Sequence, residues 1–133
     1  MALSEFSIIE QYFTSAMHRK DVVLGVGDDA ALLKVAEGMQ LAVSVDTLVA
    51  GRHFPEQTPA RAIGHKTLAA NLSDMAAMGA EPAWATLAIT LPESDSAFVE
   101  AFAEGLFNLA RQFDVELVGG DTVRGPLSLT LQM

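Results

Sequence analysis

Five aspartates of this chain stand at positions where a carboxylate is not an ordinary surface residue. They lie beside glycines, at turns or inside hydrophobic segments, and they are Asp28, Asp29, Asp46, Asp74 and Asp121. Carboxylates in such places need partners, and the chain has only 8 Lys and Arg against 17 Asp and Glu. Oxygen ligands suit Mg²⁺, whose coordination shell substrate phosphates often complete. Together the five aspartates predict a site for divalent cations, although each one alone is also explained as a turn or cap residue.

Two of the acidic segments lie in the first half of the chain. Asp28 and Asp29 follow Gly25 and Gly27 in a turn, where glycine lets the backbone approach a ligand closely. Farther on, residues 41–49 alternate so that Ser44 and Asp46 share one face of a predicted strand, roughly 7 Å apart. Each segment therefore presents oxygen atoms in one direction.

The other two acidic segments lie on a helix and at the end of a strand. Asn71, Asp74 and Met78 are spaced by three and four residues, which places them on one helix face. Gly119–Asp121 puts an acid behind two glycines at a strand end, where ligand crevices form in open sheets.

Two phosphate-binding motifs are superficially matched and rejected. Residues 25–30 fit the loose dinucleotide pattern G-x-G-x-x-A, but two carboxylates stand where a pyrophosphate would meet backbone amides. Residues 64–67 lack the glycines of a P-loop, so Lys66 is interpreted as a helix surface lysine or one that supports a site. His53 is either a surface histidine or a site residue, and Arg124 either a turn arginine or a phosphate contact.

The composition is that of one globular domain. The chain has 133 residues, of which 50% are hydrophobic and 19% charged, and this excludes a disordered tail. No hydrophobic run is long enough for a membrane span, and the start lacks the basic residues of a secretory signal. The absence of cysteine removes disulfides and thiolate chemistry, and a net charge of −9 disfavours nucleic acid and anionic membranes as partners. We expect a cytoplasmic protein.

Hydrophobic periodicity predicts three helices and five strands. The first helix begins at Ser4 and includes Phe13 and Met17, and another has Phe98 to Phe113 along its inner side. The alternation predicts an α/β fold of the α+β type, with a mixed sheet of about four strands and helices packed on one face. The expected helices span residues 4–17, 58–78 and 94–113, and the expected strands span 22–24, 41–49, 84–91, 115–118 and 127–131. Because residues 127–133 stop within a strand pattern, we expect the chain to be the first part of something longer.

Four stretches taken together resemble a known enzyme family. They are residues 25–33, 44–54, 71–82 and 119–122, and they are similar to the thiamine-monophosphate kinase family over essentially the whole chain. The patterns Asn-x-x-Asp…Met-Gly-Ala-x-Pro and Gly-Gly-Asp-Thr belong to the wider superfamily of aminoimidazole ribonucleotide synthetases. The stretch Asp-Thr-Leu-Val-x-Gly-x-His-Phe points to the thiamine branch of that superfamily.

This resemblance implies transfer of a phosphoryl group from ATP to thiamine monophosphate, assisted by several Mg²⁺ ions. The implied sheet pairs with that of a second subunit in a homodimer, and no side-chain nucleophile is expected because the acceptor phosphate is already ionised. Asp28 is implied to orient its loop. The implied metal ligands are Asp29, Ser44, Asp46, Asp74, Asp121 and the backbone carbonyl of Val45; Gly120 and Asp121 are implied to contact ATP and His53 the thiamine substrate.

The resemblance also implies a domain division. Residues 1–133 correspond to the N-terminal ATP- and Mg-binding and dimerisation domain, and the family's C-terminal domain is absent from them. We therefore expect little or no kinase activity from these residues alone. Two alternatives stay open: another ATP-dependent enzyme of the superfamily, in purine synthesis or hydrogenase maturation, or a non-catalytic domain that dimerises or binds divalent metal.

Overall fold

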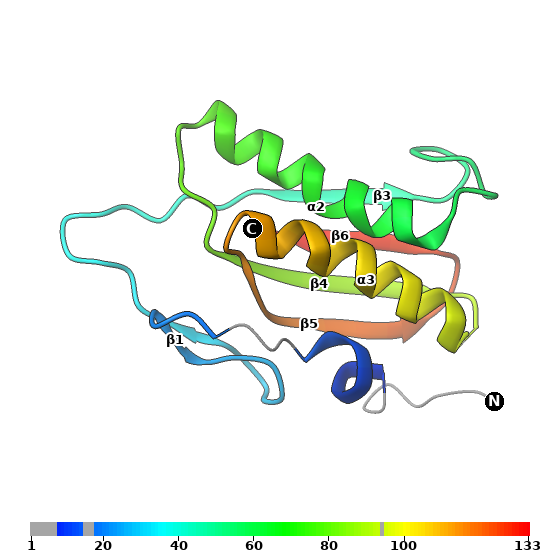
Figure 1. Cartoon of the computed structure of the whole chain (residues 1–133), viewed down its shortest axis with the longest axis horizontal. Coiled ribbons are helices and arrows are strands. Elements are labelled where there is room, and N and C mark those ends of the chain that lie inside the picture. Colours follow the sequence, from blue (N-terminus) through cyan, green and yellow to red (C-terminus); the bar gives the residue numbers. More distant parts are fainter. Residues whose placement is uncertain (1–7, 15–17, 94) are drawn as a thin grey trace.

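The computed structural model describes residues 8–14, 18–93 and 95–133. Its elements run from a short N-terminal turn through strands and two long helices to a C-terminal strand (Figure 1). In chain order they are η1 (Ile9–Phe13), β1 (Val22–Leu24), β2 (Leu32–Leu33), β3 (Val45–Val49), α2 (Ala60–Ala77), β4 (Trp84–Leu91), α3 (Ser96–Gln112), β5 (Glu116–Arg124) and β6 (Ser128–Gln132).

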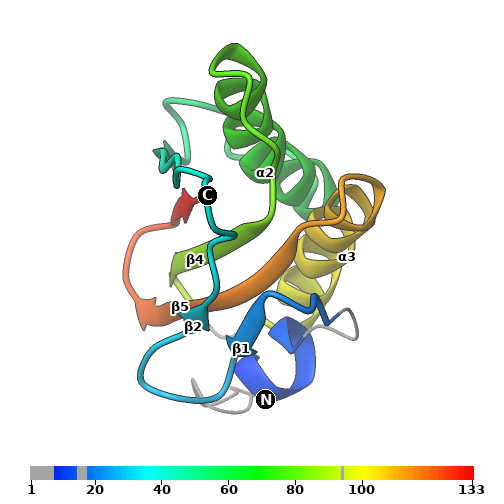
Figure 2. The same cartoon turned by 90° about the vertical axis from the view of Figure 1, so that its left-hand side faces the viewer.

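The main sheet has four strands in the order β3-β6-β4-β5. β6 pairs antiparallel with both β3 and β4, whereas β4 and β5 are parallel and are joined through α3. Figure 2 shows α2 and α3 together on one face of this sheet, while β1 and β2 form a separate two-stranded sheet beside it. The predicted mixed sheet with helices on one face is confirmed.

The core lies between the sheet and the two helices. Along β4 every second side chain is buried, as expected for a strand with one covered face. Leu87 and Ile89 of β4 stand in register with the fully buried Leu131 and Leu129 of β6. Phe102 of α3, also fully buried, is among the side chains that cover this layer from the helix side. Burial of such side chains is the main stabilising contribution, roughly 1.5–3 kcal/mol each.

The two helices cross at a contact that only glycine permits. A Cβ on Gly64 of α2 would lie 2.1 Å from the Phe102 carbonyl oxygen, and one on Gly105 of α3 would lie 2.0 Å from the Arg61 carbonyl oxygen. Each helix backbone therefore rests directly on the other. Arg61 and Glu104 form an ion pair of 2.6 Å beside this crossing.

Several predicted boundaries differ from the structure. The strand expected over 41–49 is regular only from Val45, although Ser44 still exchanges two 2.9 Å backbone hydrogen bonds with Met133. The strand expected over 115–118 continues to Arg124, because parallel pairing with β4 extends along its whole length. The short strand β2 was not predicted.

The helix predictions hold best for the two long helices. Phe113 was expected on the inner side of α3, but it ends the helix and is 49% exposed. Of the helix expected over 4–17, residues 4–7 and 15–17 lie outside the described residues, and the described part forms the wide turn η1. Ser94 also lies outside them, and Asp95 caps α3 by accepting hydrogen bonds from the backbone of Ala97 and Phe98. Within the described ranges, no helix is long and hydrophobic enough to cross a membrane.

Candidate functional site

One group of candidate ligands lies where the start of β3 meets the C-terminal half of α2. Alternation along this segment turns Ser44 and Asp46 toward α2, on the same face as the buried Leu48. The Ser44 hydroxyl donates a hydrogen bond to Oδ1 of the buried Asn71, at 3.0 Å. Asp74, one turn farther along α2, lies with its carboxyl within hydrogen-bonding reach of that of Asp46. The structure thus brings together three of the predicted metal ligands.

The electrostatics of this group favour a bound cation. The pKa of Asp46 is raised, first by its hydrogen bond with Asp74, then by partial burial and by the like charge of Asp74. In the described part of the chain, neither carboxyl forms an ion pair with a Lys or Arg. A divalent cation would relieve the repulsion, and Mg²⁺ is commonly held by one or two carboxylates with phosphates and water filling its remaining positions.

Asn71 adds an unusual buried amide beside this group. Its side chain has no exposed surface, and Nδ2 has no hydrogen-bond partner among the described residues. A buried amide nitrogen without a partner is costly, by about 1–3 kcal/mol. Its side chain contributes a fixed acceptor to the Ser44 hydroxyl, so Asn71 holds that hydroxyl in place between the strand and the helix.

The backbone carbonyl of Val45 is available for a ligand. Ser44 and Met133 form the hydrogen-bonded type of antiparallel pair, because each donates to the other. The next pair, Val45 with Gln132, is consequently of the non-hydrogen-bonded type. Since β3 is the edge strand of the main sheet, the Val45 carbonyl points to the free edge.

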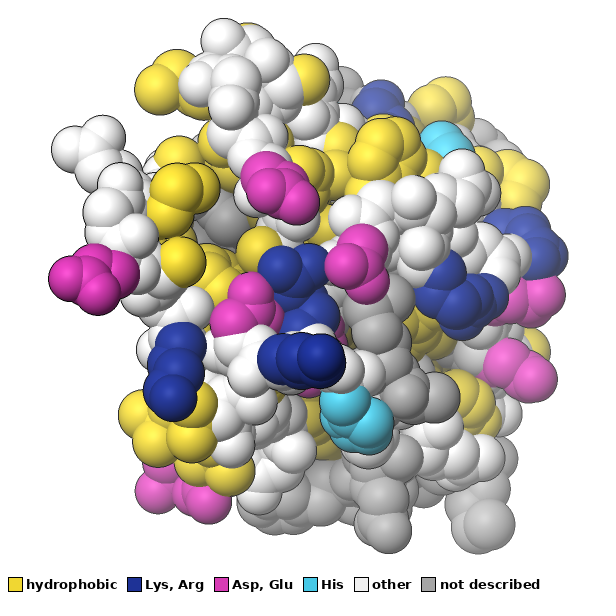
Figure 3. Space-filling model, turned by 60° about the vertical axis from the view of Figure 1, so that its left-hand side comes forward, with side chains coloured by type: hydrophobic (Ala, Val, Ile, Leu, Met, Phe, Trp, Pro, Cys, Tyr) yellow, Lys and Arg dark blue, Asp and Glu magenta, His cyan; other side chains and the backbone are white. Residues whose placement is uncertain are grey.

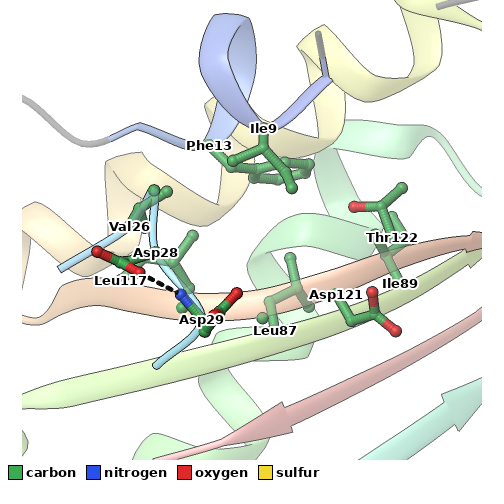
Figure 4. A pocket seen from close by; sticks show the side chains of 13 residues that line it. Ile9, Phe13, Val26, Asp28, Asp29, Leu87, Ile89, Leu117, Asp121 and Thr122 are labelled. Atoms are coloured by element: carbon green, nitrogen blue, oxygen red, sulfur yellow. Dashed lines mark hydrogen bonds between the residues drawn. The ribbon is translucent and has the colours of Figure 1, made fainter. Parts of the chain in front are cut away.

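A second group lines a pocket of about 230 Å³ between the loop after β1 and the strand β5. Figure 4 shows Asp28 and Asp29 on one side of this pocket and Asp121 on the other, with the hydrophobic Ile9 and Phe13 of η1 above. The Asp28 carboxylate accepts a hydrogen bond from the Asp29 backbone at 2.8 Å, which shapes the loop. The pocket combines acidic groups with a hydrophobic wall.

The backbone conformation and the close contact with β4 at position 120 permit only glycine. Its φ of 154° lies outside the range that residues with side chains favour, and a Cβ would lie only 1.8 Å from the Leu87 carbonyl oxygen. The register between β4 and β5 shifts just before this point, between Ala85 and Thr86. Glycine thus lets β5 lie close against β4 and leaves the pocket wall beside Asp121 without a side chain.

The two groups do not meet within one chain. Asp46, Leu131, Leu87 and Gly120 stand in one row across the sheet, which puts the ends of the row about 14 Å apart at the usual strand spacing. Both leucines between them are buried, and Asp121 points to the opposite face of the sheet from Asp46. Within the described residues, no three His, Asp or Glu side chains gather as a metal site. One shared cation therefore cannot bridge all of the predicted ligands.

His53 lies apart from both groups. It follows β3 at the end away from Ser44, about 10 Å along the strand from Asp46 to Val49. Its Nδ1 accepts a hydrogen bond from the Val49 backbone at 2.9 Å, and Lys66 donates to its carbonyl oxygen at 2.5 Å. The histidine ring is therefore held by its own turn, and among the described residues its Nε2 forms no hydrogen bond. Arg124, at the end of β5, is exposed.

The hydrophobic wall of the pocket was not foreseen as part of a site. Ile9 and Phe13 were expected only as the inner face of a helix, and Val26 only as part of a turn, yet all three line the pocket. Thr122, which also lines it, is buried. No local pattern identifies such residues, because their role depends on η1 packing near the far end of the chain.

Comparison with known proteins gives consistent results. Residues 27–133 match the model of the family described as AIR synthase related protein, N-terminal domain. The chain is 56% identical over 133 residues to the thiamine-monophosphate kinase of Escherichia coli K12, covering 98% of this chain and 41% of that protein. The chain thus spans about two-fifths of the length of this curated relative.

Solved structures agree with the sequence comparison. The crystal structure of thiamine-monophosphate kinase from Stenotrophomonas maltophilia K279a matches with a TM-score of 0.86 and 55% identity, over 99% of this chain and 42% of that one. A structure of AaThiL complexed with AMPPCP and TMP matches with a TM-score of 0.62 and 31% identity, over 68% of this chain and 30% of that one.

Proposed function

We propose that this chain is the N-terminal part of a thiamine-monophosphate kinase. The chain belongs to the family described as AIR synthase related protein, N-terminal domain. The complete protein transfers the terminal phosphoryl group of ATP to thiamine monophosphate, which yields thiamine diphosphate and ADP. The observation that carries this proposal is the 56% identity to the Escherichia coli kinase across nearly the whole chain.

The chemistry explains why such a site needs acidic residues. Donor and acceptor are both polyanions, so their approach is opposed by Coulomb repulsion. When bound, Mg²⁺ neutralises phosphate charge and stabilises the transferring group. The residues of this chain hold and orient oxygen donors for that purpose. No side-chain nucleophile takes part, because a phosphate oxygen of the acceptor is already ionised.

The two acidic groups are assigned different tasks. Asp29 and Asp121, at the glycine-lined pocket, face the nucleotide phosphates, and Gly120 lets those phosphates approach β5. Asp46 and Asp74, with Ser44 and the Val45 carbonyl beside them, hold a further cation. This division is supported by the 14 Å separation, since separate groups suit two phosphate-bearing reactants better than one shared ion. Asp28 shapes the loop through its hydrogen bond to Asp29.

His53 is assigned to the thiamine substrate. The turn after β3 fixes its ring through Nδ1, and its side chain is exposed. A fixed, accessible ring whose second nitrogen has no partner within the described ranges can recognise a substrate without reorganising. This assignment rests on the family resemblance of the stretch that contains it.

The complete protein is proposed to be a homodimer with a second domain. On the face of the sheet opposite the helices, Val45, Val49 and Val123 are 59%, 38% and 49% exposed. All three stand on this open face by strand register, and a second sheet would cover it. The rest of the full-length protein supplies further nucleotide, metal and thiamine contacts. We also propose a cytoplasmic location, where ATP is supplied, and no nucleic-acid or anionic-membrane partner, because the chain carries a net charge of −9.

A turnover assay on the full-length protein tests the proposal. With ATP, Mg²⁺ and thiamine monophosphate, we expect equal amounts of ADP and thiamine diphosphate. A panel of other acceptors, followed by ADP release, separates this kinase from superfamily members that act on different substrates. ADP release with another acceptor, and none with thiamine monophosphate, would show that the assigned substrate is wrong. Calorimetry with Mg-ATP adds a check, because a purely structural domain binds no nucleotide.

A further inference from the structure

The loop that carries Asp28 and Asp29 is not hydrogen-bonded to the sheet it faces. Among the described residues, no hydrogen bond joins residues 25–29 to β4, β5 or β6. The hairpin formed by β1 and β2 also buries little, since Val23 and Leu32 are 59% and 54% exposed. The position of the two aspartates relative to Asp121 must therefore be fixed by contacts outside the loop.

The hairpin is anchored at its base through Arg19. The guanidinium group of Arg19 donates two hydrogen bonds to the Asp21 carboxylate, at 3.0 and 2.9 Å. Its third nitrogen reaches the carbonyl oxygen of Asp114 at 2.6 Å and the carboxylate of the same residue at 3.3 Å. Arg19 thus connects the chain entering β1 to the turn between α3 and β5. A bidentate arginine–carboxylate pair fixes geometry as well as position.

Two neighbouring contacts extend this anchor to the main sheet. Trp84, the first residue of β4, donates its indole N–H to Asp21 at 3.0 Å. The backbone N–H of Arg19 donates to the carboxylate of Glu116, the first residue of β5, at 2.5 Å. Glu116 is only 4% exposed, so this bond is sheltered from water. We call the five residues Arg19, Asp21, Trp84, Asp114 and Glu116 the Arg19 network.

The Arg19 network also closes the hairpin. The carbonyl oxygen of Asp21 accepts a hydrogen bond from the Lys34 backbone at 2.7 Å, where the chain leaves β2. The network therefore holds both ends of the hairpin against the start of β5. Asp121 lies five residues farther along the same strand, about 17 Å away. Figure 3 shows Lys and Arg side chains lying directly beside Asp and Glu side chains on this side of the molecule.

We propose that Arg19 is a positioning residue for the nucleotide pocket: through Asp21 and Asp114 it fixes the β1–β2 hairpin so that Asp28 and Asp29 face Asp121. This inference rests on the proposed function in assigning the pocket to a nucleotide, whereas the anchoring itself does not depend on that assignment. Arg19 is not among the residues that line the pocket, and it acts through the hairpin.

The test compares Arg19→Met with Arg61→Met in the full-length protein. Both substitutions remove an arginine that is paired with a carboxylate, but Arg61 pairs with Glu104 beside the helix crossing. For Arg19→Met we expect the Mg-ATP concentration that gives the half-maximal rate to rise about tenfold. This is the size of effect expected when the charged hydrogen bonds between Arg19 and Asp21 are lost. The KM for thiamine monophosphate should change less than about twofold. Arg19→Lys, which keeps the charge, should recover part of the loss, and Arg61→Met should leave both constants unchanged.

Hydrogen–deuterium exchange gives a second measurement that does not need activity. In Arg19→Met we expect peptides covering residues 22–34 to exchange faster while peptides from α2 and α3 keep their rates. If these rates stay unchanged, or if all peptides speed up together, Arg19 is not a specific anchor of the hairpin. If the hairpin loosens but Mg-ATP dependence is unaltered in an active enzyme, the positioning role is refuted. If the unsubstituted full-length protein is itself inactive while the hairpin of Arg19→Met loosens, the proposed function is refuted and the anchoring role of Arg19 stands.

Discussion

The carboxyl group of Asp46 on β3 meets that of Asp74 on α2, and the contact raises the pKa of Asp46. The two residues are 28 positions apart in the sequence, and they meet because α2 packs beside the start of β3. Two acids placed side by side destabilise the folded state unless a proton or a cation lies between them.

Mg²⁺ should stabilise the folded protein through this pair. Because the like charge is removed, Asp46→Asn should raise the free energy of unfolding without Mg²⁺ at pH 7, by up to about 1 kcal/mol. The same variant should gain less from added Mg²⁺ than the unsubstituted protein. Thermal unfolding with and without Mg²⁺ measures both effects, and NaCl at equal ionic strength controls for screening. Equal Mg²⁺ stabilisation in both proteins would argue against a cation at this pair.

The same carboxylates should be needed for turnover. In the full-length enzyme, Asp46→Asn or Asp74→Asn should lower activity at least about 100-fold, as expected when electrostatic stabilisation of a transition state is lost. Steady-state rates at saturating Mg²⁺ measure this loss. Glu104→Gln, on the surface of α3, serves as a matched control that removes one acid outside the site. Near-normal turnover in either aspartate variant would refute the assignment.

Gly120→Ala should destabilise the sheet more than a glycine substitution at an open position. A Cβ at Gly120 would overlap the Leu87 carbonyl oxygen, so we expect a loss of at least about 2 kcal/mol in the free energy of unfolding. Gly38 also has a positive φ, 81°, but a Cβ there meets nothing within 4 Å. Gly38→Ala should therefore cost only about 1 kcal/mol, the penalty of the backbone conformation. Urea unfolding compares the two, and similar losses would contradict the close approach of β5 to β4.

Acid should weaken the Arg19–Asp21 pair. The hydrogen bonds from Arg19, and then that from Trp84, hold the pKa of Asp21 below its ordinary value of about 3.9. The unfolded state then binds more protons in acid, so the stability from this carboxylate is present above about pH 4 and is lost as the pH falls through the folded-state pKa. The difference in unfolding free energy between the unsubstituted protein and Asp21→Asn should be constant from pH 7 to 5 and shrink toward pH 3. The side chain of Asp114 is 80% exposed, so Asp114→Asn should show little difference at any pH. A difference for Asp21→Asn that persists at pH 3 would contradict the pairing.

Regular periodicity was enough to predict the parts of the fold that make the core. Trp84–Leu91 was predicted with its observed bounds, because a hydrophobic run between Pro82 and Pro92 defines a buried strand locally. The extension of β5 to Arg124 was not predictable, since it depends on pairing with a strand 32 positions earlier, Trp84 with Glu116. Local propensity weakens at Gly119 and Gly120, and only the neighbouring strand shows that these residues continue it.

The candidate site was predictable in its chemistry but not in its arrangement. Residue types identified the acids, and the strand and helix periods placed Ser44 with Asp46 and Asn71 with Asp74 on shared faces. The five aspartates were predicted to form a site for divalent cations together, and this pattern did not anticipate that Leu131 and Leu87 fill the row between Asp46 and Gly120. The Arg19 network was missed because its members lie up to 97 positions apart in the sequence.

Both acidic groups are proposed to hold divalent cations for the phosphates of two substrates. The most direct measurement is a crystal structure of the full-length protein with Mn²⁺ in place of Mg²⁺, a non-hydrolysable ATP analogue and thiamine monophosphate. Anomalous scattering locates each Mn²⁺ without reference to the refined coordinates. We predict peaks within coordination distance of the Asp46 and Asp74 carboxylates and of Asp29 or Asp121, with phosphate oxygens on the same ions. Phosphates bound elsewhere, with no peak at either group, would show that neither group holds a cation for the substrates.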